Sequence, residues 1–163
     1  MFRRILVPID GSPPSNRGLE QAIALAKDQK ARLCLLHVVD ELLMMPAFDG
    51  SMYVPASYRD DFTKAMREEG SKLLAKADAT ARRGRVRADV VLLETTGRRV
   101  AELVIKQARK WRADVIVLGT HGRRGLARVL MGSDAEMVVR ESPVPVLLVR
   151  APLRRRRRPA AKR

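Results

Sequence analysis

Five short apolar runs alternate along the chain with four stretches of helical periodicity, and this alternation constrains the fold more than any other feature. The apolar runs are continuous, which is typical of strands buried on both faces of a sheet. They cover residues 3–9, 33–39, 89–93, 114–118 and 143–149. Because strand and helix follow each other in turn, the pattern predicts a parallel sheet with right-handed crossovers.

The helical stretches repeat apolar residues at intervals of three and four, as in Leu19, Ala22, Ile23 and Ala26. The predicted helices cover residues 16–29, 60–83, 100–111 and 133–141. Residues 40–58 have no clear period and contain several methionine, proline and glycine residues. This segment is therefore predicted to form a loop.

Two strands are followed by residues that suit ligand binding. Asp10-Gly11-Ser12 follows the first strand, and Gly119-Thr120-His121-Gly122 follows the fourth. In doubly wound sheets, ligands bind at the carboxyl ends of the strands where the winding reverses. If both motifs serve one site, the first and fourth strands are neighbours and the strand order is 3-2-1-4-5. The predicted fold class is α/β: a doubly wound, Rossmann-like, five-stranded parallel sheet with helices on both faces.

A second glycine motif, Gly132-Ser133, begins the last predicted helix. Glycines let the backbone approach an anion, and a helix N-terminus offers free N–H groups and partial positive charge. The combination predicts a nucleotide-binding site, although Ser133 could instead serve as the helix N-cap. The arginines between the two motifs, including Arg123 and Arg124, either form a solvated basic loop or pair with phosphate oxygens.

The spacing Gly119-x-x-Gly122-x9-Gly132-Ser133 resembles the ATP-binding signature of the universal stress protein family. Residues 5–12, 35–39 and 142–149 resemble the first, second and closing strands of that family. The likeness covers roughly residues 2–150. The family has a five-stranded parallel sheet of the order given above, of the adenine nucleotide alpha hydrolase-like type.

The resemblance implies that the cofactor is ATP with Mg²⁺. The positions it places around the nucleotide are Pro8, Asp10, Val38, Leu118, Gly119, His121, Gly122, Arg123, Arg124, Gly132, Ser133 and Asp134. Asp10 would meet the adenosine end or its metal-bound surroundings, and the Val38 backbone would recognise adenine. Pro8 and Leu118 would form the walls. The chain itself is predicted to hold no metal without ATP.

The other matched positions would serve the ribose and the phosphates. Gly119, His121 and Gly122 would line both groups, and Gly132 and Ser133 would hold the phosphates. Asp134 stands where the family often has a small or apolar residue. Its charge would repel a triphosphate unless it faces away or meets a divalent cation.

The sequence predicts a regulatory protein rather than an enzyme. It contains no G-x-x-x-x-G-K-[ST] motif and no carboxylate clearly placed to activate water. The leading hypothesis is an ATP-dependent switch of the stress response, in which slow hydrolysis is allowed. The family generally dimerises, and the apolar edge strand from Val144 to Val149 predicts a homodimer.

The charge of the chain is concentrated at its end. The formal net charge is +15, and residues 150–163 contribute eight basic residues and no acids. The other 149 residues, with 25 basic and 18 acidic side chains, carry +7. We predict a nucleotide-binding domain over residues 1–150 and a disordered tail over 151–163. The alternative function is nucleic-acid or polyanion binding through Arg154 to Arg158.

The remaining features suggest a cytoplasmic protein without a membrane partner. No apolar run approaches the roughly 18 residues of a membrane span, and the first residues lack the pattern of a signal peptide. Cys34, the only cysteine, is interpreted as a small buried apolar residue. His37 is interpreted as a packed, hydrogen-bonded core group.

Overall fold

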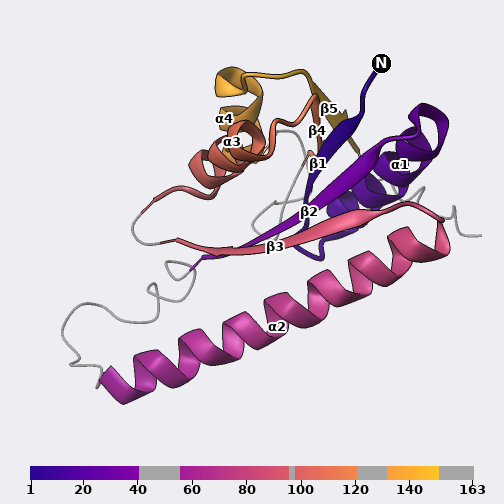
Figure 1. The fold of residues 1–163 in the computed structure, drawn as a ribbon. Coiled ribbons are helices and arrows are strands. Elements are labelled where there is room, and N and C mark those ends of the chain that lie inside the picture. The colour runs from indigo at the N-terminus through magenta and orange to yellow at the C-terminus, as the bar shows by residue number, and fades with distance from the viewer. Residues whose placement is uncertain (41–55, 96–97, 121–131, 151–163) are drawn as a thin grey trace, which may run out of the picture.

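The computed structural model describes residues 1–40, 56–95, 98–120 and 132–150. In the second of these ranges, side chains are described from residue 61 onward. Its strands form one parallel sheet in the order β3-β2-β1-β4-β5, which confirms the predicted order (Figure 1). In chain order the elements are β1 (Arg4–Pro8), α1 (Pro13–Gln29), β2 (Arg32–Val39), α2 (Ala56–Arg83), β3 (Ala88–Glu94), α3 (Val100–Trp111), β4 (Val115–Gly119), α4 (Ser133–Glu141) and β5 (Val146–Val149).

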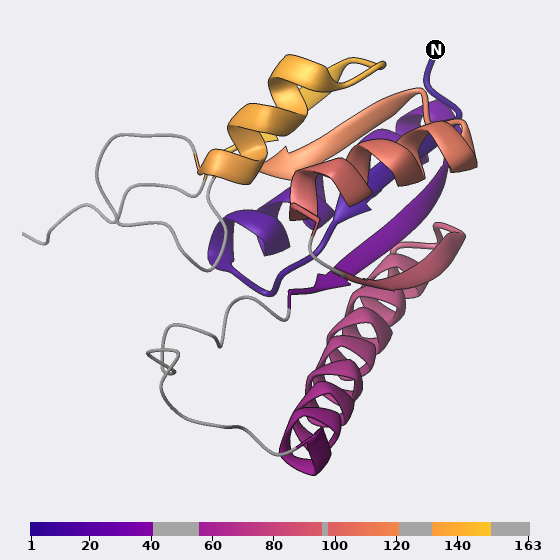
Figure 2. The same ribbon diagram turned by 90° about the vertical axis from the view of Figure 1, so that its left-hand side faces the viewer.

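Helices cover both faces of the sheet, so the doubly wound architecture is also confirmed. α1 and α2 pack on one face, and α3 and α4 pack on the other (Figures 1 and 2). The winding therefore reverses between β1 and β4, which are hydrogen-bonded neighbours. A crevice at the carboxyl ends of these two strands is the expected ligand site of such a fold.

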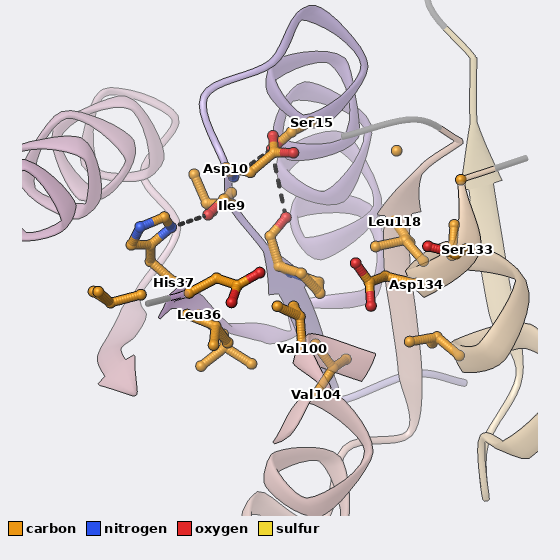
Figure 3. A pocket seen from close by; sticks show the side chains of 18 of the residues that line it. Ile9, Asp10, Ser15, Leu36, His37, Val100, Val104, Leu118, Ser133 and Asp134 are labelled. Carbon is orange, nitrogen blue, oxygen red and sulfur yellow. Dashed lines mark hydrogen bonds between the residues drawn. The ribbon is translucent and has the colours of Figure 1, made fainter. Parts of the chain in front are cut away.

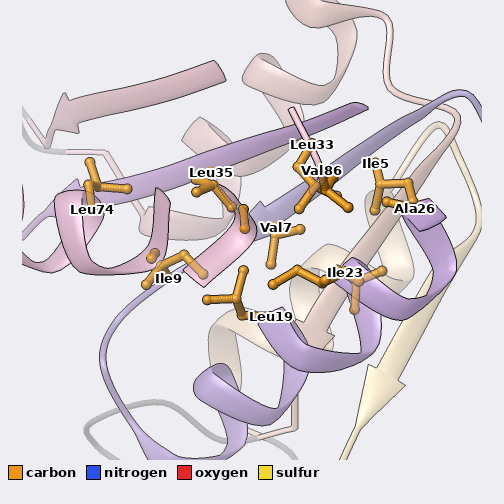
Figure 4. Close-up of a cluster of buried hydrophobic side chains, with 14 of the residues drawn as sticks. Ile5, Val7, Ile9, Leu19, Ile23, Ala26, Leu33, Leu35, Leu74 and Val86 are labelled. Carbon is orange, nitrogen blue, oxygen red and sulfur yellow. The ribbon is translucent and has the colours of Figure 1, made fainter. Parts of the chain in front are cut away.

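Each face of the sheet has its own buried core, because successive residues of a strand point to opposite faces. In β1, Ile5 and Val7 pack toward α1 and α2, whereas Leu6 packs toward α3 and α4. Figure 4 shows the first of these cores, where Leu19 and Ile23 of α1 meet the strands. Cys34 is fully buried in the second core, as predicted.

The prediction that every strand is buried on both faces is right for the central strands and wrong for the edges. Val90 of β3 is 47% exposed and Leu147 of β5 is 42% exposed. An edge strand has a neighbouring strand on one side only, so part of its surface stays open to solvent even where a helix packs on it. Hydrophobicity alone did not distinguish the two situations.

Several predicted boundaries move in the structure. α1 begins at Pro13 rather than at residue 16, because Ser12 caps the helix and prolines fit its first positions. α2 begins at Ala56, so residues 56–58 are helical rather than loop. β5 begins at Val146 rather than at 143, since Pro143 and Pro145 have no N–H to donate.

Some predictions concern segments outside the described residues. These are the loop over 41–55 and the arginine-rich tail over 151–163. Among the helices that are described, none combines the length and the apolar composition that a membrane span requires.

Candidate functional site

A pocket of about 280 Å³ opens at the carboxyl end of the sheet, where β1 and β4 part (Figure 3). β1 pairs with β2 over its whole length, from Arg4 to Pro8. β1 pairs with β4 only at Ile5 and Leu6. The two strands whose ends were predicted to form one site therefore do line one pocket.

Pro8 explains why the ladder between β1 and β4 stops. The amide of Ile9 donates to the Leu36 carbonyl of β2 at 2.7 Å. Because successive amides of a strand point to opposite neighbours, the Pro8 nitrogen faces β4, and it carries no hydrogen. The strand pair consequently opens at Pro8, which lines the pocket.

The turn after β1 holds the Asp10 carboxylate at the pocket. Asp10 Oδ1 accepts the Ser12 N–H at 2.9 Å, and Ser15 Oγ accepts the Asp10 N–H at 3.1 Å. Ser12 Oγ in turn accepts the Ser15 N–H at 3.3 Å, which caps α1. These bonds connect the carboxylate to the first turn of α1, so its position follows from the local sequence (Figure 3).

His37 forms part of the β2 wall of the pocket. Its Nδ1 lies 2.6 Å from the Ile9 carbonyl oxygen. Since a carbonyl oxygen only accepts, Nδ1 carries the proton. A Cβ atom at Gly70 of α2 would lie 2.7 Å from His37 Cδ2, so the ring fills the space between strand and helix. The interpretation of His37 as a packed, hydrogen-bonded group is confirmed, and the ring also borders the pocket.

The opposite wall comes from the end of β4 and the start of α4. The Thr120 N–H donates to the Val149 carbonyl at 3.0 Å, and the Gly132 N–H donates to the Thr120 carbonyl at 3.1 Å. Gly132 is the N-cap of α4 and Ser133 its first residue, so the alternative role of Ser133 as N-cap is wrong. This arrangement directs the amino end of α4 at the pocket.

The described lining of the pocket contains acidic side chains but no Lys or Arg. Its carboxylates are Asp10, Asp40 and Asp134, of which Asp40 is buried and 3.5 Å from Thr95 Oγ1. Figure 3 shows Asp134 projecting into the pocket from α4. The counterpart of these charges is the amino end of α4, with its unbonded N–H groups and partial positive charge. Within the described residues, no group of three metal-ligating side chains is close enough to hold a metal ion.

Eight of the twelve residues predicted from the sequence line this pocket. They are Pro8, Asp10, Val38, Leu118, Gly119, Gly132, Ser133 and Asp134. The other four, His121, Gly122, Arg123 and Arg124, lie outside the described residues.

The sequence prediction missed several lining residues. Asp40 directly follows β2, and Asp10 comes two residues after the end of β1. An acidic residue at the carboxyl end of a strand was the signal for Asp10, and it could also have identified Asp40. Val100, Val104 and Val138 also border the pocket, although their helical spacing indicated only core packing. These apolar side chains pack in the core and also line the pocket.

Comparison with known proteins gives a consistent result along almost the whole chain. The family model described as the universal stress protein family matches residues 1–150. The chain is 34% identical over 151 residues to universal stress protein YxiE of Bacillus subtilis, covering 92% of this chain and all of that protein. It is also similar to a solved universal stress protein structure from Burkholderia pseudomallei, with 35% identity, a TM-score of 0.70, and coverage of 90% and 94% of the two chains.

Two more distant structures share the fold and contain a nucleotide. One is a universal stress protein in complex with cAMP, with 21% identity, a TM-score of 0.65, and coverage of 93% and 99%. The other is the Archaeoglobus fulgidus protein in complex with dAMP, with 20% identity, a TM-score of 0.63, and coverage of 90% and 97%.

Proposed function

This chain belongs to the universal stress protein family, and on that premise we propose that it is an ATP-binding regulatory protein acting as a nucleotide-dependent switch in the stress response. The observation that carries the proposal is the pocket between β1 and β4, into which the amino end of α4 is directed. A crevice at the winding reversal of a parallel sheet with a helix N-terminus beside it suits a phosphorylated ligand.

The shape of the pocket supports an adenine nucleotide. Pro8, Val38 and Leu118 give apolar walls for a base, while Gly132 and Ser133 line the pocket where the proposed phosphates would lie. Two proteins with the same fold bind cAMP or dAMP, which are both adenine nucleotides. We assign Mg²⁺ a role only together with ATP, because Asp10 and Asp134 supply the carboxylate oxygens that such an ion prefers when it also meets phosphates.

The proposed role is regulatory rather than catalytic. The Asp10 carboxylate accepts a backbone N–H of its own turn, which suits a fixed ligand contact better than proton transfer. ATP can act as a switch only if it favours one conformation over another. In this proposal the bound phosphates stabilise the arrangement of α4 against β4, while slow hydrolysis resets it.

We also propose that the protein is a homodimer joined along β5. This strand is an edge of the sheet, and Leu147 on it is 42% exposed. An apolar strand with an unpaired edge favours pairing with a second copy.

Calorimetric titration of MgATP into the full chain tests the nucleotide site. We expect saturable binding near one ATP per chain that is lost in Gly132→Val. Gly132 has φ −60°, a conformation that valine tolerates, so this variant should fold while its side chain blocks the amino end of α4.

A second variant excludes binding of triphosphate to the basic tail. Replacing Arg154 to Arg158 with serine in the full chain should leave the saturable site intact. Loss of MgATP binding in this variant, together with normal binding by Gly132→Val, would contradict the proposal. The polyanion-binding function of the tail would then replace it.

A further inference from the structure

The amino-terminal end of the sheet, opposite the proposed nucleotide pocket, carries a groove of about 1060 Å³, and every charged residue of its described lining is a cation. We call it the basic groove. It is bordered by the start of β1, the α1–β2 turn and the α2–β3 turn. Its cations are Arg3, Arg4, Lys27, Lys30, Arg32, Arg85 and Arg87.

Helix dipoles explain part of this charge. In a doubly wound fold, the helices end at the same edge at which the parallel strands begin. Cations near a helix C-terminus are favourable because the last carbonyls carry partial negative charge. Lys27 lies in the last turn of α1, and Arg82 and Arg83 lie in the last turn of α2.

Two of the groove cations occupy backbone positions just after a helix, where glycine is the residue usually found. Lys30 and Arg85 have φ values of 52° and 58°, in the left-handed region. Glycine adopts this conformation without steric cost and is the usual residue at such helix ends. Arg112 at the end of α3 has φ 54° as well, so a cation holds this left-handed position at three helix ends, and two of the three line the groove.

Most of the groove cations have no acidic partner within the described residues. Arg32 pairs with Asp89 through contacts of 2.8 and 3.0 Å. The side chains of the other six groove cations form no ion pair with any described carboxylate. These six are Arg3, Arg4, Lys27, Lys30, Arg85 and Arg87. Two carboxylates lie beside the groove: Asp89 pairs with Arg32, and Asp114 accepts the backbone N–H groups of Arg3 and Arg4 at 2.7 and 2.9 Å. Seven cations outnumber these two acids, and the excess of like charge creates a positive potential that attracts a polyanion.

Trp111, the last residue of α3, holds two of the groove arginines in place. The Arg4 guanidinium lies 4.9 Å from the centre of the Trp111 ring, and that of Arg32 lies 6.0 Å from it. The indole N–H donates to Asp89 Oδ2 at 2.8 Å. Trp111 therefore positions guanidinium groups instead of offering a free surface on which bases could stack.

We propose that the basic groove binds a nucleic acid strand through its phosphates, independently of base sequence. Five of the seven cations are arginines, whose planar forks match phosphate oxygens. A concave groove fits an extended strand better than a flat membrane surface. A protein partner would need an apolar or aromatic centre. The described lining has one large exposed apolar side chain, Met1, and its apolar residues Ala26 and Val86 are buried.

The basic groove and the nucleotide pocket are separate sites. Arg4 and Pro8 lie at opposite ends of β1, and each borders a different site. The four residue steps from Arg4 to Pro8 span about 13 Å of strand. Occupation of one site therefore leaves the other open, and a nucleotide-bound protein could still hold a strand.

Fluorescence anisotropy of a labelled 20-nucleotide single-stranded DNA, titrated with the full chain at several salt concentrations, tests the proposal. The groove variant combines Lys30→Gly, Arg85→Gly and Arg87→Gln, and its two glycines relieve the left-handed backbone. We expect its affinity to fall at least about 10-fold near 0.1 M salt, with the slope of log K against log salt reduced by roughly 2.

Two further variants separate the groove from general charge and from the tail. Lys64→Gln, Lys72→Gln and Lys106→Gln together remove the same charge from exposed helix positions that do not line the groove. We expect this control to change the affinity less than about threefold. Substitution of Arg154 to Arg158 by serine should leave the difference between groove variant and parent in place.

Four outcomes would overturn the proposal. They are an absence of DNA binding even at low salt, equal losses in the groove and control variants, complete loss with the tail substitution alone, and displacement of the DNA by polyglutamate as effectively as by unlabelled DNA. The last result would assign the groove to an acidic protein.

Discussion

A Cβ atom built on Gly119 would stand only 2.8 Å from the amide nitrogen of Ser15, so the end of β4 meets the first turn of α1 without room for a side chain. Ser15 also bonds the Asp10 amide, which links this contact to the turn at the pocket. Gly119 entered the site prediction as a phosphate-binding glycine. Its packing against α1 is a second, independent requirement for glycine at this position.

Gly119→Ala should therefore destabilise the protein even without nucleotide. The new methyl group would press on the backbone of Pro14 and Ser15, which cannot rotate away. Overpacking of this kind costs about 1–3 kcal/mol. Urea unfolding followed by circular dichroism measures the loss.

Gly18→Ala is the matched control for this change. A Cβ atom at Gly18 would lie 3.6 Å from the Gly119 nitrogen, which is ordinary contact. Because alanine is the better helix former, α1 should gain up to about 1 kcal/mol. Equal effects of the two substitutions would contradict the packing argument.

The role of Asp134 gives a second prediction, which depends on the proposed nucleotide site. Asp134 lies in the first turn of α4 and lines the pocket. Its charge should repel unneutralised phosphates, so Asp134→Asn should raise the affinity for Mg²⁺-free ATP by about 3- to 10-fold, or roughly 1 kcal/mol. The affinity for adenosine should not change. Calorimetry with both ligands, with and without Mg²⁺, measures the effect.

Glu136→Gln serves as the control, because Glu136 lies in the same helical turn but is exposed and does not line the pocket. Both substitutions remove one charge near the same helix end. If they change ATP binding equally, the effect comes from the helix dipole rather than from the carboxylate in the pocket.

Cys34 provides a prediction of pH dependence. Burial raises the pKa of the Cys34 thiol from 9.0 to about 11, while a hydrogen bond from Gln107 opposes the rise. The folded state holds this proton more tightly than the unfolded state, so the stability from the neutral thiol is complete below pH 9. This contribution, on the order of 3 kcal/mol, is lost as the pH rises from about 9 to about 11.

Comparison of the parent with Cys34→Ala isolates this contribution from other groups that titrate in the same range. Between pH 8.5 and 10.5, the unfolding free energy of the parent should decline more steeply than that of the variant. Parallel declines would mean that the thiol does not contribute.

Much of the fold could be predicted because its signals are local. The apolar runs and the helical periods identified every element from β1 to β5, and the shared position of two motifs gave the strand order. Element ends were less accurate. Ser12 caps α1 and the two prolines after it form its first positions. The same residue types are typical of turns, so the sequence predicted a start at residue 16.

The site could be predicted only in part, because some of its residues are recognisable from the fold rather than from a motif. Pro8 opens the strand pair through its missing N–H, which matters only once β4 lies beside it. His37 borders the pocket because Gly70, 33 positions later in the chain, leaves space for its ring. Neither relation is visible in local sequence.

The proposed dimer gives the last prediction, since it places an exposed apolar side chain at the joint between two copies. Leu147 of β5 is 42% exposed, and Leu147→Glu would put two charges close together across a symmetric strand pair. We expect the variant to be a monomer in light scattering after gel filtration, at concentrations at which the parent is a dimer. Val90→Glu is the matched control, because Val90 is 47% exposed on the opposite edge strand, β3. This control should leave the dimer intact. If Val90→Glu dissociates the dimer while Leu147→Glu does not, the two copies pair along β3 instead of β5.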